Sequence, residues 1–433
     1  KVEIKNSMAE IQPFRGVLYD QSKVHLDDVV APPYDVIAPE QQEKLYERNE
    51  YNVVRLILGR EEDRYASAAL HLGEWLERGV LVRDARPALY ILTQSFTGSN
   101  GKTIVRKGFV ALCRLEEFDK KIVLPHEKTL AKPREDRLKL FQSTHTNLSQ
   151  IFSLYPDSEK AIDRVLNGYQ DTEPLIDVMF EEVQNRVWRL EDAGKIRQVQ
   201  DLMKRNQVLI ADGHHRYETA LAYRDAMREK NPRHTGEELY NYVMMFFANI
   251  DDEGLVIYPT HRIVHSLTGF DSRSFLGQLE QHFILREFKE TDGLLKALNS
   301  SSVRSLGFKI KGEPVAYLAT LKPTNLASQI VPDDIPVELK ELDVTLLHSV
   351  VFRDLLSISI EAQEQKRNID YVRKAEDAVA AVDSGKAQIA CLMNPTRIEE
   401  VRAVAKAGYT MPQKSTYFFP KLVSGLVINL LSE

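Results

Sequence analysis

The sequence predicts an α/β protein, with a mixed α+β arrangement as the alternative, because strand-like and helix-like segments alternate along the chain. The clearest example is at residues 207–221, where the apolar run QVLI precedes ADGHHRYETAL. Such a run is typical of a buried strand, whereas the residues after it have helical spacing. Gly213, at the junction, allows the backbone to turn sharply. No internal repeat or low-complexity tract interrupts the alternation.

The elements of the first half follow from their patterning. Residues 88–96 and 103–115 are apolar and flank the turn-forming GSNGK, which predicts a hairpin. Pro133, near the start of the basic segment 133–145, is typical of the first turn of a helix. The remaining predicted strands are 52–59, 148–155, 174–182, 185–192 and 207–210, and the remaining predicted helices are 64–79, 193–205 and 214–229.

A polar stretch, EKNPRHTGEE at 229–238, is typical of a long loop or a boundary. The sequence therefore predicts two lobes, residues 9–235 and 236–433, of which the second is also α/β. The continuous apolar run 242–250 predicts a buried strand. Further strands are expected at 255–267, 283–290 and 387–393, a hairpin at 305–322 around Gly312, and helices at 271–282, 341–357, 371–384 and 396–407.

Composition limits the classes of function. The formal net charge of −6 argues against a long nucleic-acid or anionic-membrane surface as the main partner. No apolar run approaches the roughly 18–20 residues of a membrane span, and no signal-peptide pattern begins the chain, so we expect a cytoplasmic protein. Two cysteines, Cys113 and Cys391, fit a reducing compartment. Met8 offers a natural start, so residues 1–7 are expected to be an extension.

The turn after the 207–210 strand is the first candidate site. It carries one carboxylate (Asp212), two imidazoles (His214 and His215) and a guanidinium (Arg216). The free N–H groups and positive dipole end of the following helix face the same region, so phosphate is the ligand that this turn suits best. The alternative is structural: Asp212 caps the helix, the histidines are surface side chains, and Arg216 pairs with an acid.

The loop LPHEKT at 124–129 is the second candidate. It places His126, Glu127 and Lys128 together, and an acid, a base and a cation suit proton transfer beside a phosphate. The alternative is a solvated loop. Downstream, Lys132, Arg134 and Arg137 either neutralise a polyphosphate or form the exposed face of a helix.

Three further segments combine turn chemistry with reactive side chains. APPYDVI (31–37) presents Tyr34 and Asp35 on an extended chain held by two prolines, or is simply a rigid turn with a capping acid. YPTHR (258–262) interrupts an apolar strand pattern with polar side chains. MPQKSTYFFPKL (411–422) brings Lys414 and Ser415 within reach of a phosphate, or anchors the tail through its aromatics.

The common nucleotide and hydrolase motifs are absent from the sequence. It contains neither G-x-x-x-x-G-K-[ST] nor G-x-G-x-x-G, and neither H-E-x-x-H nor G-x-S-x-G. A nucleotide enzyme built on the common phosphate loop and a serine hydrolase elbow are therefore excluded.

Six motifs, read in order, resemble those of a widespread prokaryotic family, domain-of-unknown-function family 1015. The resemblance covers residues 9–433 and does not by itself imply an activity. The motifs are PFRG (13–16), APPYDVI (31–37), LPHEKT (124–129), ADGHHRYETAL (211–221), YPTHR (258–262) and MPQKSTYFFPKL (411–422).

The turn DGHHR (212–216) also resembles, more distantly, that of archaeal kinases of free L-serine, which belong to the ParB/sulfiredoxin-like superfamily. The resemblance implies a ParB/sulfiredoxin-like nucleotide-binding core with large insertions in the first lobe. It implies that Gly213, His214, His215 and Arg216 bind nucleotide phosphates, and that Asp212 assists transfer or holds the metal.

Differences between this sequence and these relatives exclude some of the functions found in the superfamily. His214 stands where a sulfiredoxin has its reactive cysteine, which argues against sulfinic-acid reduction. The acidic composition argues against a ParB-like DNA clamp. The catalytic glutamate of the kinases has no clear counterpart, so Glu127 and Asp35 are candidates for its role.

The leading hypothesis is a nucleotide-dependent phosphotransferase that converts free L-serine, or a similar hydroxyl metabolite, to its phosphate ester. It would use ATP or ADP with Mg²⁺, and His126 and Lys128 would add phosphate contacts. One alternative is a non-catalytic sensor of a nucleotide or phosphometabolite. Another is a metal-dependent phosphohydrolase, although adjacent histidines diverge by about 100° on a helix. The expected partners are the nucleotide and the small substrate, with a second copy of the chain as a further candidate. We expect neither a membrane nor nucleic acid as a partner.

Overall fold

A computed structural model describes residues 8–129, 131–324 and 327–431; residues 1–7, the expected extension, lie outside the described part. The chain forms two compact units, each built of both helices and strands, so the α/β class is confirmed. The first unit comprises the chain up to residue 125 together with 129–256 and 420–433. The second comprises 126–128 and 257–419.

This division differs from the predicted boundary between residues 235 and 236. The strand β12 (Tyr242–Asn249) pairs with β8 (Ile151–Tyr155) on one side and β5 (Thr103–Arg114) on the other, so it lies inside the first unit's sheet. The chain after residue 420 also returns to the first unit, where β21 (Asn429–Leu430) pairs with β7 (Thr146–Asn147).

Nine strands of the described residues form the main sheet of the first unit, in the order β6-β11-β8-β12-β5-β4-β10-β9, with β1 also paired to β5. The pairs β6–β11 and β8–β12 are parallel and the other pairs are antiparallel. The strands not yet given are β1 (Ile11–Gln12), β4 (Leu89–Thr97), β6 (Val123–Leu124), β9 (Ile176–Phe180), β10 (Val183–Leu190) and β11 (Val208–Asp212).

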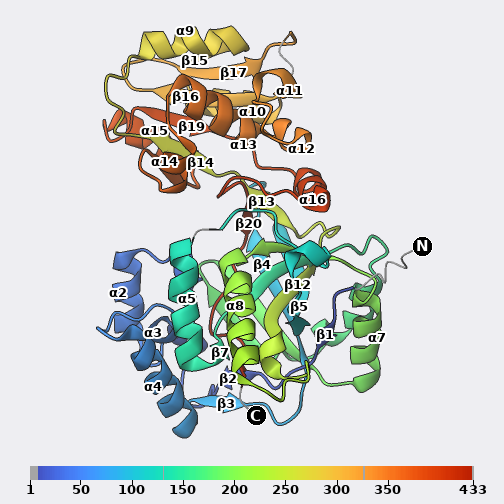
Figure 1. Cartoon of the computed structure of the whole chain (residues 1–433). Helices are drawn as coiled ribbons and strands as arrows, with labels where there is room; N and C mark the ends of the chain where they lie inside the picture. The colour runs from blue at the N-terminus through green and yellow to red at the C-terminus, as the bar shows by residue number, and fades with distance from the viewer. Residues whose placement is uncertain (1–7, 130, 325–326, 432–433) are drawn as a thin grey trace, which may run out of the picture. The chain divides into compact units, whose positions relative to one another are not determined.

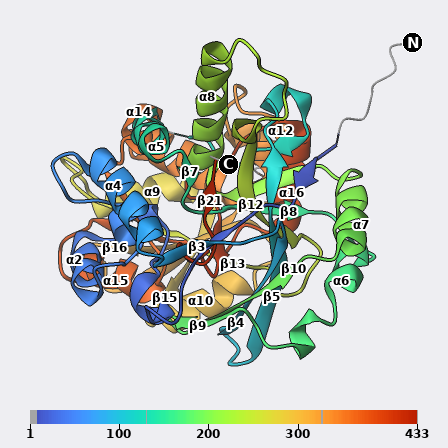
Figure 2. The same ribbon diagram turned by 90° about the horizontal axis from the view of Figure 1, so that it is seen from below.

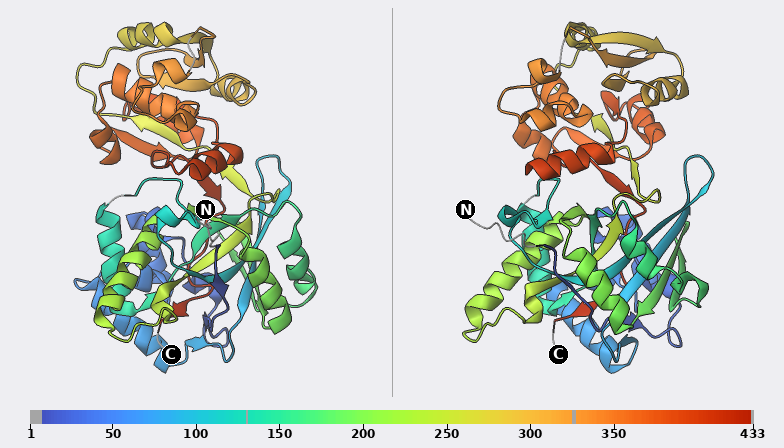
Figure 3. Two further views of the ribbon diagram at one scale, coloured as in Figure 1. Left: turned by 45° about the vertical axis from the view of Figure 1, so that its right-hand side comes forward. Right: turned by 90° about the vertical axis from the view of Figure 1, so that its right-hand side faces the viewer.

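The core of the first unit lies on both faces of this sheet. Every residue of β12 is buried, as expected for its continuous apolar run. The ring of Phe247 on this strand stacks on Phe109 of β5 at 5.2 Å between centroids. The predicted hairpin is confirmed as β4 and β5, and Figure 3 shows this long ribbon from two sides.

Helices cover the sheet of the first unit. The two helices α5 (Ala131–Thr144) and α8 (His214–Lys230) lie side by side (Figure 1), whereas α6 (Ala161–Leu166) and α7 (Ala193–Met203) lie together at another edge (Figure 2). The other elements are α1 (Leu26–Val29), α2 (Pro39–Arg48), α3 (Val54–Ile57), α4 (Arg64–Glu77), the 3₁₀ helices at Tyr34–Val36, Phe118–Lys120, Tyr169–Asp171 and Leu239–Asn241, and the pair β2 (Val17–Tyr19) and β3 (Leu81–Arg83).

The predicted strand at 52–59 is wrong, because this segment forms the short helix α3. The buried Asn52 side chain accepts a hydrogen bond from the backbone N–H of Val54 at 2.9 Å and donates one to the carbonyl oxygen of Asp28 at 2.7 Å. These bonds favour a helical start that the apolar pattern alone does not reveal.

The main sheet of the second unit has the order β15-β17-β16-β19-β14-β18, and its pairings are antiparallel. Its strands are β14 (His261–Val264), β15 (Phe283–Phe288), β16 (Ser305–Ile310), β17 (Ala316–Leu321), β18 (Ile369–Val372) and β19 (Ile389–Leu392), with a separate pair β13 (Val256–Tyr258) and β20 (Tyr417–Phe419). Its helices are α9 (Ser272–His282), α10 (Thr291–Asn299), α11 (Ala327–Ile330), α12 (Val337–Lys340), α13 (Asp343–Thr345), α14 (Ile360–Glu364), α15 (Ala375–Asp383) and α16 (Ile398–Ala407).

Helices pack on both faces of this second sheet. On β16, Phe308 contacts Phe275 of α9, and a side chain at the neighbouring Gly307 would meet Leu294 of α10. Successive strand residues face opposite sides of a sheet, so α9 and α10 cover opposite faces.

Three predictions for this unit differ in detail from the structure. The helix expected at 341–357 is instead α13 followed by a π-helical segment, Leu346–Leu355. The segment 371–384 begins as the end of β18 before α15. The strand expected at 255–267 is split into β13 and β14, with Pro259 between them, because proline lacks the N–H that a strand donates.

None of the helices in the described part of the chain is both long and apolar enough to span a bilayer.

Candidate functional site

The predicted strand–turn–helix at 207–221 is confirmed. The strand β11 ends at Asp212, Gly213 adopts the left-handed conformation (φ 93°, ψ 28°), and α8 begins at His214. A methyl group added at Gly213 would lie 2.9 Å from the guanidinium of Arg216. The Arg216 side chain therefore folds back over the turn, beside the amino-terminal end of α8.

Two cations hold the Asp212 carboxylate. Its oxygens lie 3.5 Å from the Arg216 guanidinium and 3.4 Å from the Lys421 ammonium. Arg216 also donates a hydrogen bond to the carbonyl oxygen of Gln150, which fixes its position. The Asp212 and Arg216 side chains remain 22% and 14% exposed, so both can be reached by a ligand.

A third cation, Arg106 on β5, lies buried near this carboxylate. Its Nη2 donates hydrogen bonds to the Gln94 amide oxygen and the Pro420 carbonyl, while Nε and Nη1 have no hydrogen-bond partner among the residues that the structure describes. Its guanidinium lies 4.4 Å from the ring centre of Phe152. Burial lowers the pKa of Arg106 to about 9, and the negative charge of Asp212 opposes this shift.

A pocket beside the turn is lined by Tyr34, Arg137 and Arg216, with hydroxyl and amide groups from Ser149 and Asn147. Its empty volume is about 520 Å³, part of which is open to solvent. The Arg137 guanidinium lies 4.0 Å from the ring centre of Tyr34 and donates a hydrogen bond to the carbonyl oxygen of Ile57 at 2.6 Å. Two guanidiniums on one pocket suit an anionic ligand.

The 31–37 motif thus reaches the same pocket as the 212–216 turn. Burial, followed by the charge of Asp35, raises the pKa of Tyr34 to about 12, so its hydroxyl is a hydrogen-bond donor at neutral pH. Asp35 itself is exposed in the 3₁₀ turn.

The two imidazoles are less open than the sequence suggests. His214 is 8% exposed and His215 is half-buried, and neither belongs to the described lining of this pocket. The helix start turns His214 toward the protein interior, so it is placed to support the turn.

The 124–129 motif makes its contacts mainly within the second unit. His126 is fully buried with Nε2 2.8 Å from the Thr416 hydroxyl, and the Glu127 carboxylate accepts a hydrogen bond from the Thr416 backbone N–H at 3.0 Å. Lys128 is exposed, and its backbone N–H donates a hydrogen bond to the carbonyl oxygen of Met411. Residues 126–128 are therefore bound to the 411–416 loop, where Ser415 is buried as an anchor.

Sequence reasoning missed two of the cations that surround Asp212. Arg106 is a single basic residue within an apolar strand pattern, and Lys421 lies far beyond the turn, near the end of the sequence. Arg137 was recognised only as one charge on a basic helix, and the Lys132 side chain lies outside the described residues.

Within the described ranges, no group of three or more His, Cys, Asp and Glu side chains is arranged to hold a metal ion. Asp212 offers a single carboxylate. That number suits Mg²⁺, which is commonly bound by one or two carboxylates together with substrate phosphates.

Gly213→Ala is expected to destabilise the first unit by about 1–2 kcal/mol, because alanine is strained at a positive φ and displaces Arg216. Urea unfolding of the variant measures this change. Gly73→Ala, in α4, is the matched control: its added methyl meets no atom within 4 Å, so the same substitution should be neutral or stabilising. If Gly213→Ala and Gly73→Ala change the free energy of unfolding equally, the backbone strain expected at Gly213 is wrong.

The YPTHR motif places a histidine in the second unit's core. His261 is 3% exposed, and its Nδ1 accepts a hydrogen bond from the backbone N–H of Met393 at 3.1 Å. Burial, with the positive charge of Arg262, lowers the His261 pKa to about 4. The folded state therefore binds fewer protons than the unfolded state between pH 4 and 6.5.

Stability of the second unit should consequently fall by about 2 kcal/mol between pH 7 and pH 5 through His261 alone. His261→Gln is expected to flatten this part of the profile, as measured by urea unfolding at both pH values. His25→Gln, at an exposed position, serves as the control. A slope that His261→Gln leaves unchanged would refute the assignment.

The family described as "Protein of unknown function (DUF1015)" matches residues 11–345. No curated protein matches the chain. Among solved structures, the chain is similar to a conserved hypothetical protein from Pyrococcus furiosus, with 12% identity over 71% of this chain and 92% of that chain and a TM-score of 0.35. A free serine kinase in complex with ADP has 10% identity over 71% and 88%, with a TM-score of 0.37. SbnI from Staphylococcus aureus, truncated at its C-terminus, has 11% identity over 75% and 89%, with a TM-score of 0.36.

Proposed function

The chain belongs to the DUF1015 family, and from this premise we propose that it is a nucleotide-dependent phosphotransferase acting on a small hydroxyl metabolite. The proposed reaction converts free L-serine to O-phosphoserine, with ATP or ADP as the donor and Mg²⁺ as the metal. The observation that carries the proposal is the convergence of Arg216, Arg137 and the start of α8 beside the Asp212 carboxylate.

Phosphoryl transfer needs mainly positioning and charge neutralisation. Arg216 and Arg137 line one pocket and would bind the nucleotide phosphates, with the first N–H groups of α8. Lys421 and Arg106 add positive charge around Asp212. Three cations, Arg216, Lys421 and Arg106, therefore surround the single Asp212 carboxylate and leave an excess of positive charge that favours a polyphosphate. Arg137, which is paired with Asp136, adds a second guanidinium to the pocket.

Asp212 is the proposed general base or Mg²⁺ ligand, and Mg²⁺ would neutralise the phosphate oxygens when bound. In the transfer step, the acceptor oxygen bonds to the terminal phosphorus, the bond from phosphorus to the bridging oxygen breaks, and a carboxylate takes the hydroxyl proton. Asp35, exposed beside the Tyr34 side of the pocket, is the second candidate base. Glu127 is the third.

The roles proposed for the remaining residues differ with their exposure. His215 and Gly213 would contact phosphate at the turn. The buried His214 would position the turn, and His126 and Lys128 stay proposed phosphate contacts of the second unit's loop.

A second candidate function is a non-catalytic sensor of a nucleotide or phosphometabolite. This candidate is favoured by the pairing of Asp212 with both Arg216 and Lys421. A carboxylate held by two cations can stabilise a binding site without acting as a general base. Tight nucleotide binding with no turnover of small alcohols would support this candidate.

The decisive experiment incubates the purified chain with ATP or ADP, Mg²⁺ and L-serine. Mass spectrometry should detect O-phosphoserine in proportion to enzyme and time, and a panel of other small alcohols would define the acceptor. If the chain binds nucleotide saturably but no acceptor is phosphorylated, the phosphotransferase hypothesis is wrong and the sensor hypothesis is supported.

A further inference from the structure

The end of the 411–422 motif belongs to the first unit, where Lys421 reaches the Asp212 carboxylate. The Lys421 Nζ lies 3.4 Å from Asp212 Oδ1, and the Arg216 Nη2 lies 3.5 Å from Asp212 Oδ2. Each oxygen of this carboxylate therefore already has a cation beside it. Mg²⁺ binds carboxylate oxygens at about 2.0–2.1 Å, so it would have to take the place of one of these two cations.

The two guanidiniums near Asp212 are fixed by the surrounding fold. Arg216 donates a hydrogen bond to the Gln150 carbonyl and lies over the turn. Arg106 is 1% exposed, and its hydrogen bonds to the Gln94 side chain and the Pro420 carbonyl hold it within the sheet. Displacing either guanidinium would break these hydrogen bonds, so neither is suited to leave when a metal ion arrives.

Lys421 is anchored through its backbone instead. Its carbonyl oxygen accepts a hydrogen bond from the buried side-chain amide of Gln94 at 3.1 Å, and the preceding carbonyl, of Pro420, accepts one from Arg106. These bonds hold the chain whichever way the ammonium group points. A lysine carries a point charge on a flexible four-carbon stem, so the Lys421 ammonium can turn from one oxygen to another without moving the backbone.

We propose that Lys421 occupies the place of a divalent cation at Asp212 in the unliganded protein, and that its ammonium group moves to the nucleotide phosphates when metal and nucleotide bind. The proposal rests on the proposed function in taking Asp212 as the Mg²⁺ ligand. Coulomb repulsion between a divalent ion and an ammonium group on one carboxylate favours the exchange. Phosphates at the start of α8 would offer the displaced ammonium a new negative partner.

The first test measures the affinity of the full-length chain for Mn²⁺ without nucleotide, by electron paramagnetic resonance. Mn²⁺ takes the same oxygen ligands as Mg²⁺. Lys421→Met keeps most of the stem and removes the competing charge, so it should bind Mn²⁺ at least about tenfold more tightly than the unaltered chain. Unchanged or weaker binding by Lys421→Met would overturn the proposal, as would the absence of binding to either protein.

Two control variants assign this effect to the Lys421–Asp212 pair. Lys204→Met removes a lysine that lies 3.3 Å from Asp201 in an exposed pair at the end of α7, and it should leave Mn²⁺ affinity unchanged. Asp212→Asn, added to Lys421→Met, should abolish the gain in affinity. If Lys204→Met gives the same gain, the effect is one of overall charge and the exchange is refuted.

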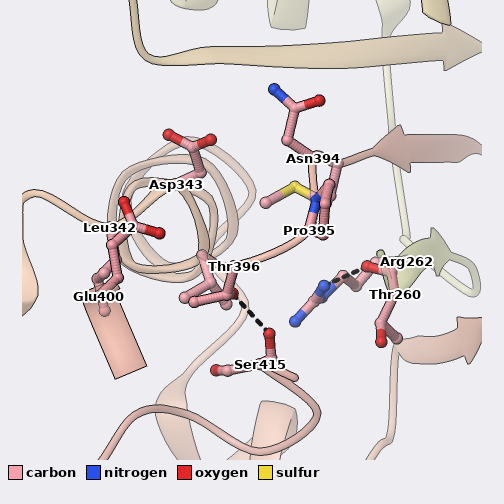
Figure 4. A pocket seen from close by; sticks show the side chains of 11 residues that line it. Thr260, Arg262, Leu342, Asp343, Asn394, Pro395, Thr396, Glu400 and Ser415 are labelled. Atoms are coloured by element: carbon pink, nitrogen blue, oxygen red, sulfur yellow. Dashed lines mark hydrogen bonds between the residues drawn. The ribbon is translucent and has the colours of Figure 1, made fainter. Parts of the chain in front are cut away.

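A second pair of neighbouring carboxylates, Asp343 and Glu400, lies beside a small pocket of the second unit (Figure 4). Arg304 Nη1 lies 3.4 Å and 2.8 Å from the two carboxylates, and Arg397 Nη2 lies 3.3 Å from Glu400. Two guanidiniums thus neutralise this pair, so Asp343→Asn, added to Lys421→Met, should leave the tighter Mn²⁺ binding intact. Loss of that binding would place the metal in the second unit and contradict the proposal.

The second test concerns the move to the phosphates. With Mg²⁺ at saturation, Lys421→Met should bind ADP at least about tenfold more weakly than the unaltered chain, because it lacks one charge-assisted hydrogen bond to a phosphate. Equal ADP affinities would refute the move. Thermal unfolding of the same samples checks the fold, and Lys421→Gln is the second neutral variant for both tests if Lys421→Met does not fold.

The exchange and the proposed function fail in different ways. Mn²⁺ binding needs neither an acceptor nor turnover. Tighter Mn²⁺ binding and weaker ADP binding by Lys421→Met, without phosphoserine formation by the unaltered chain, would support the exchange and leave a sensor. Phosphoserine formation by the unaltered chain, with Mn²⁺ affinity unaffected by Lys421→Met, would support the phosphotransferase and refute the exchange.

Discussion

Asp212→Asn is expected to lower the rate of phosphoserine formation by about 10²–10⁴-fold, the usual contribution of a general base. Asparagine has nearly the same shape, and its amide oxygen can still accept hydrogen bonds from Arg216 and Lys421. Asparagine cannot, however, take the proton from the substrate hydroxyl, and it binds Mg²⁺ more weakly than aspartate does. Nucleotide binding measured without metal should therefore be largely preserved.

Steady-state rates, with nucleotide affinity measured in parallel, separate these two effects. Asp225→Asn, at an exposed position on the same helix, is the control and should be fully active. An Asp212→Asn enzyme with the normal rate would exclude Asp212 as the base. Attention would then turn to Asp35→Asn and Glu127→Gln in the same assay.

Arg216→Ala is expected to weaken nucleotide binding at least about 100-fold, equivalent to about 3 kcal/mol. The guanidinium lies over the turn and on the pocket, so its loss removes both charge and a two-pronged hydrogen-bond donor. The variant should still fold, because water can replace the hydrogen bond from Arg216 to the Gln150 carbonyl and Asp212 keeps Lys421 as a partner.

Calorimetry with ADP and thermal unfolding of the same samples check both halves of this expectation. Arg228→Ala removes an arginine of α8 that donates to the Asn241 side chain, and it should bind ADP normally. If Arg216→Ala and Arg228→Ala bind ADP with equal affinity, the 212–216 turn does not bind the nucleotide.

The local part of the site could be predicted from sequence because its determinants are adjacent in the chain. An apolar strand, a glycine and a helical pattern within 207–221 specify the turn, and the structure has β11, a left-handed Gly213 and α8 there. The pairing of Tyr34 with Arg137 is different. Each of these residues lies in a segment that the sequence singles out, but the sequence does not show that the two segments meet.

The rest could not be predicted because tertiary structure decides it. Nothing in the local pattern of 242–249 reveals that this strand lies between β8 and β5. A buried side chain, Asn52, converts an apolar run into α3. Arg106 of β5 lies close enough to feel the charge of Asp212 only because the sheet brings strands distant in the sequence together.

The return of residues 420–431 to the first unit has a consequence for biosynthesis. These residues supply β21, the carbonyl that binds Arg106 and the ammonium beside Asp212. The chain leaves the ribosome amino-terminal end first, so the second unit emerges before the segment 420–431 that completes the first unit. The nine-stranded sheet can form before this segment emerges, whereas ribosome-bound chains that stop before residue 420 should lack the partner strand of β7 and the carbonyl that binds Arg106, and should be more open to chaperones and proteases.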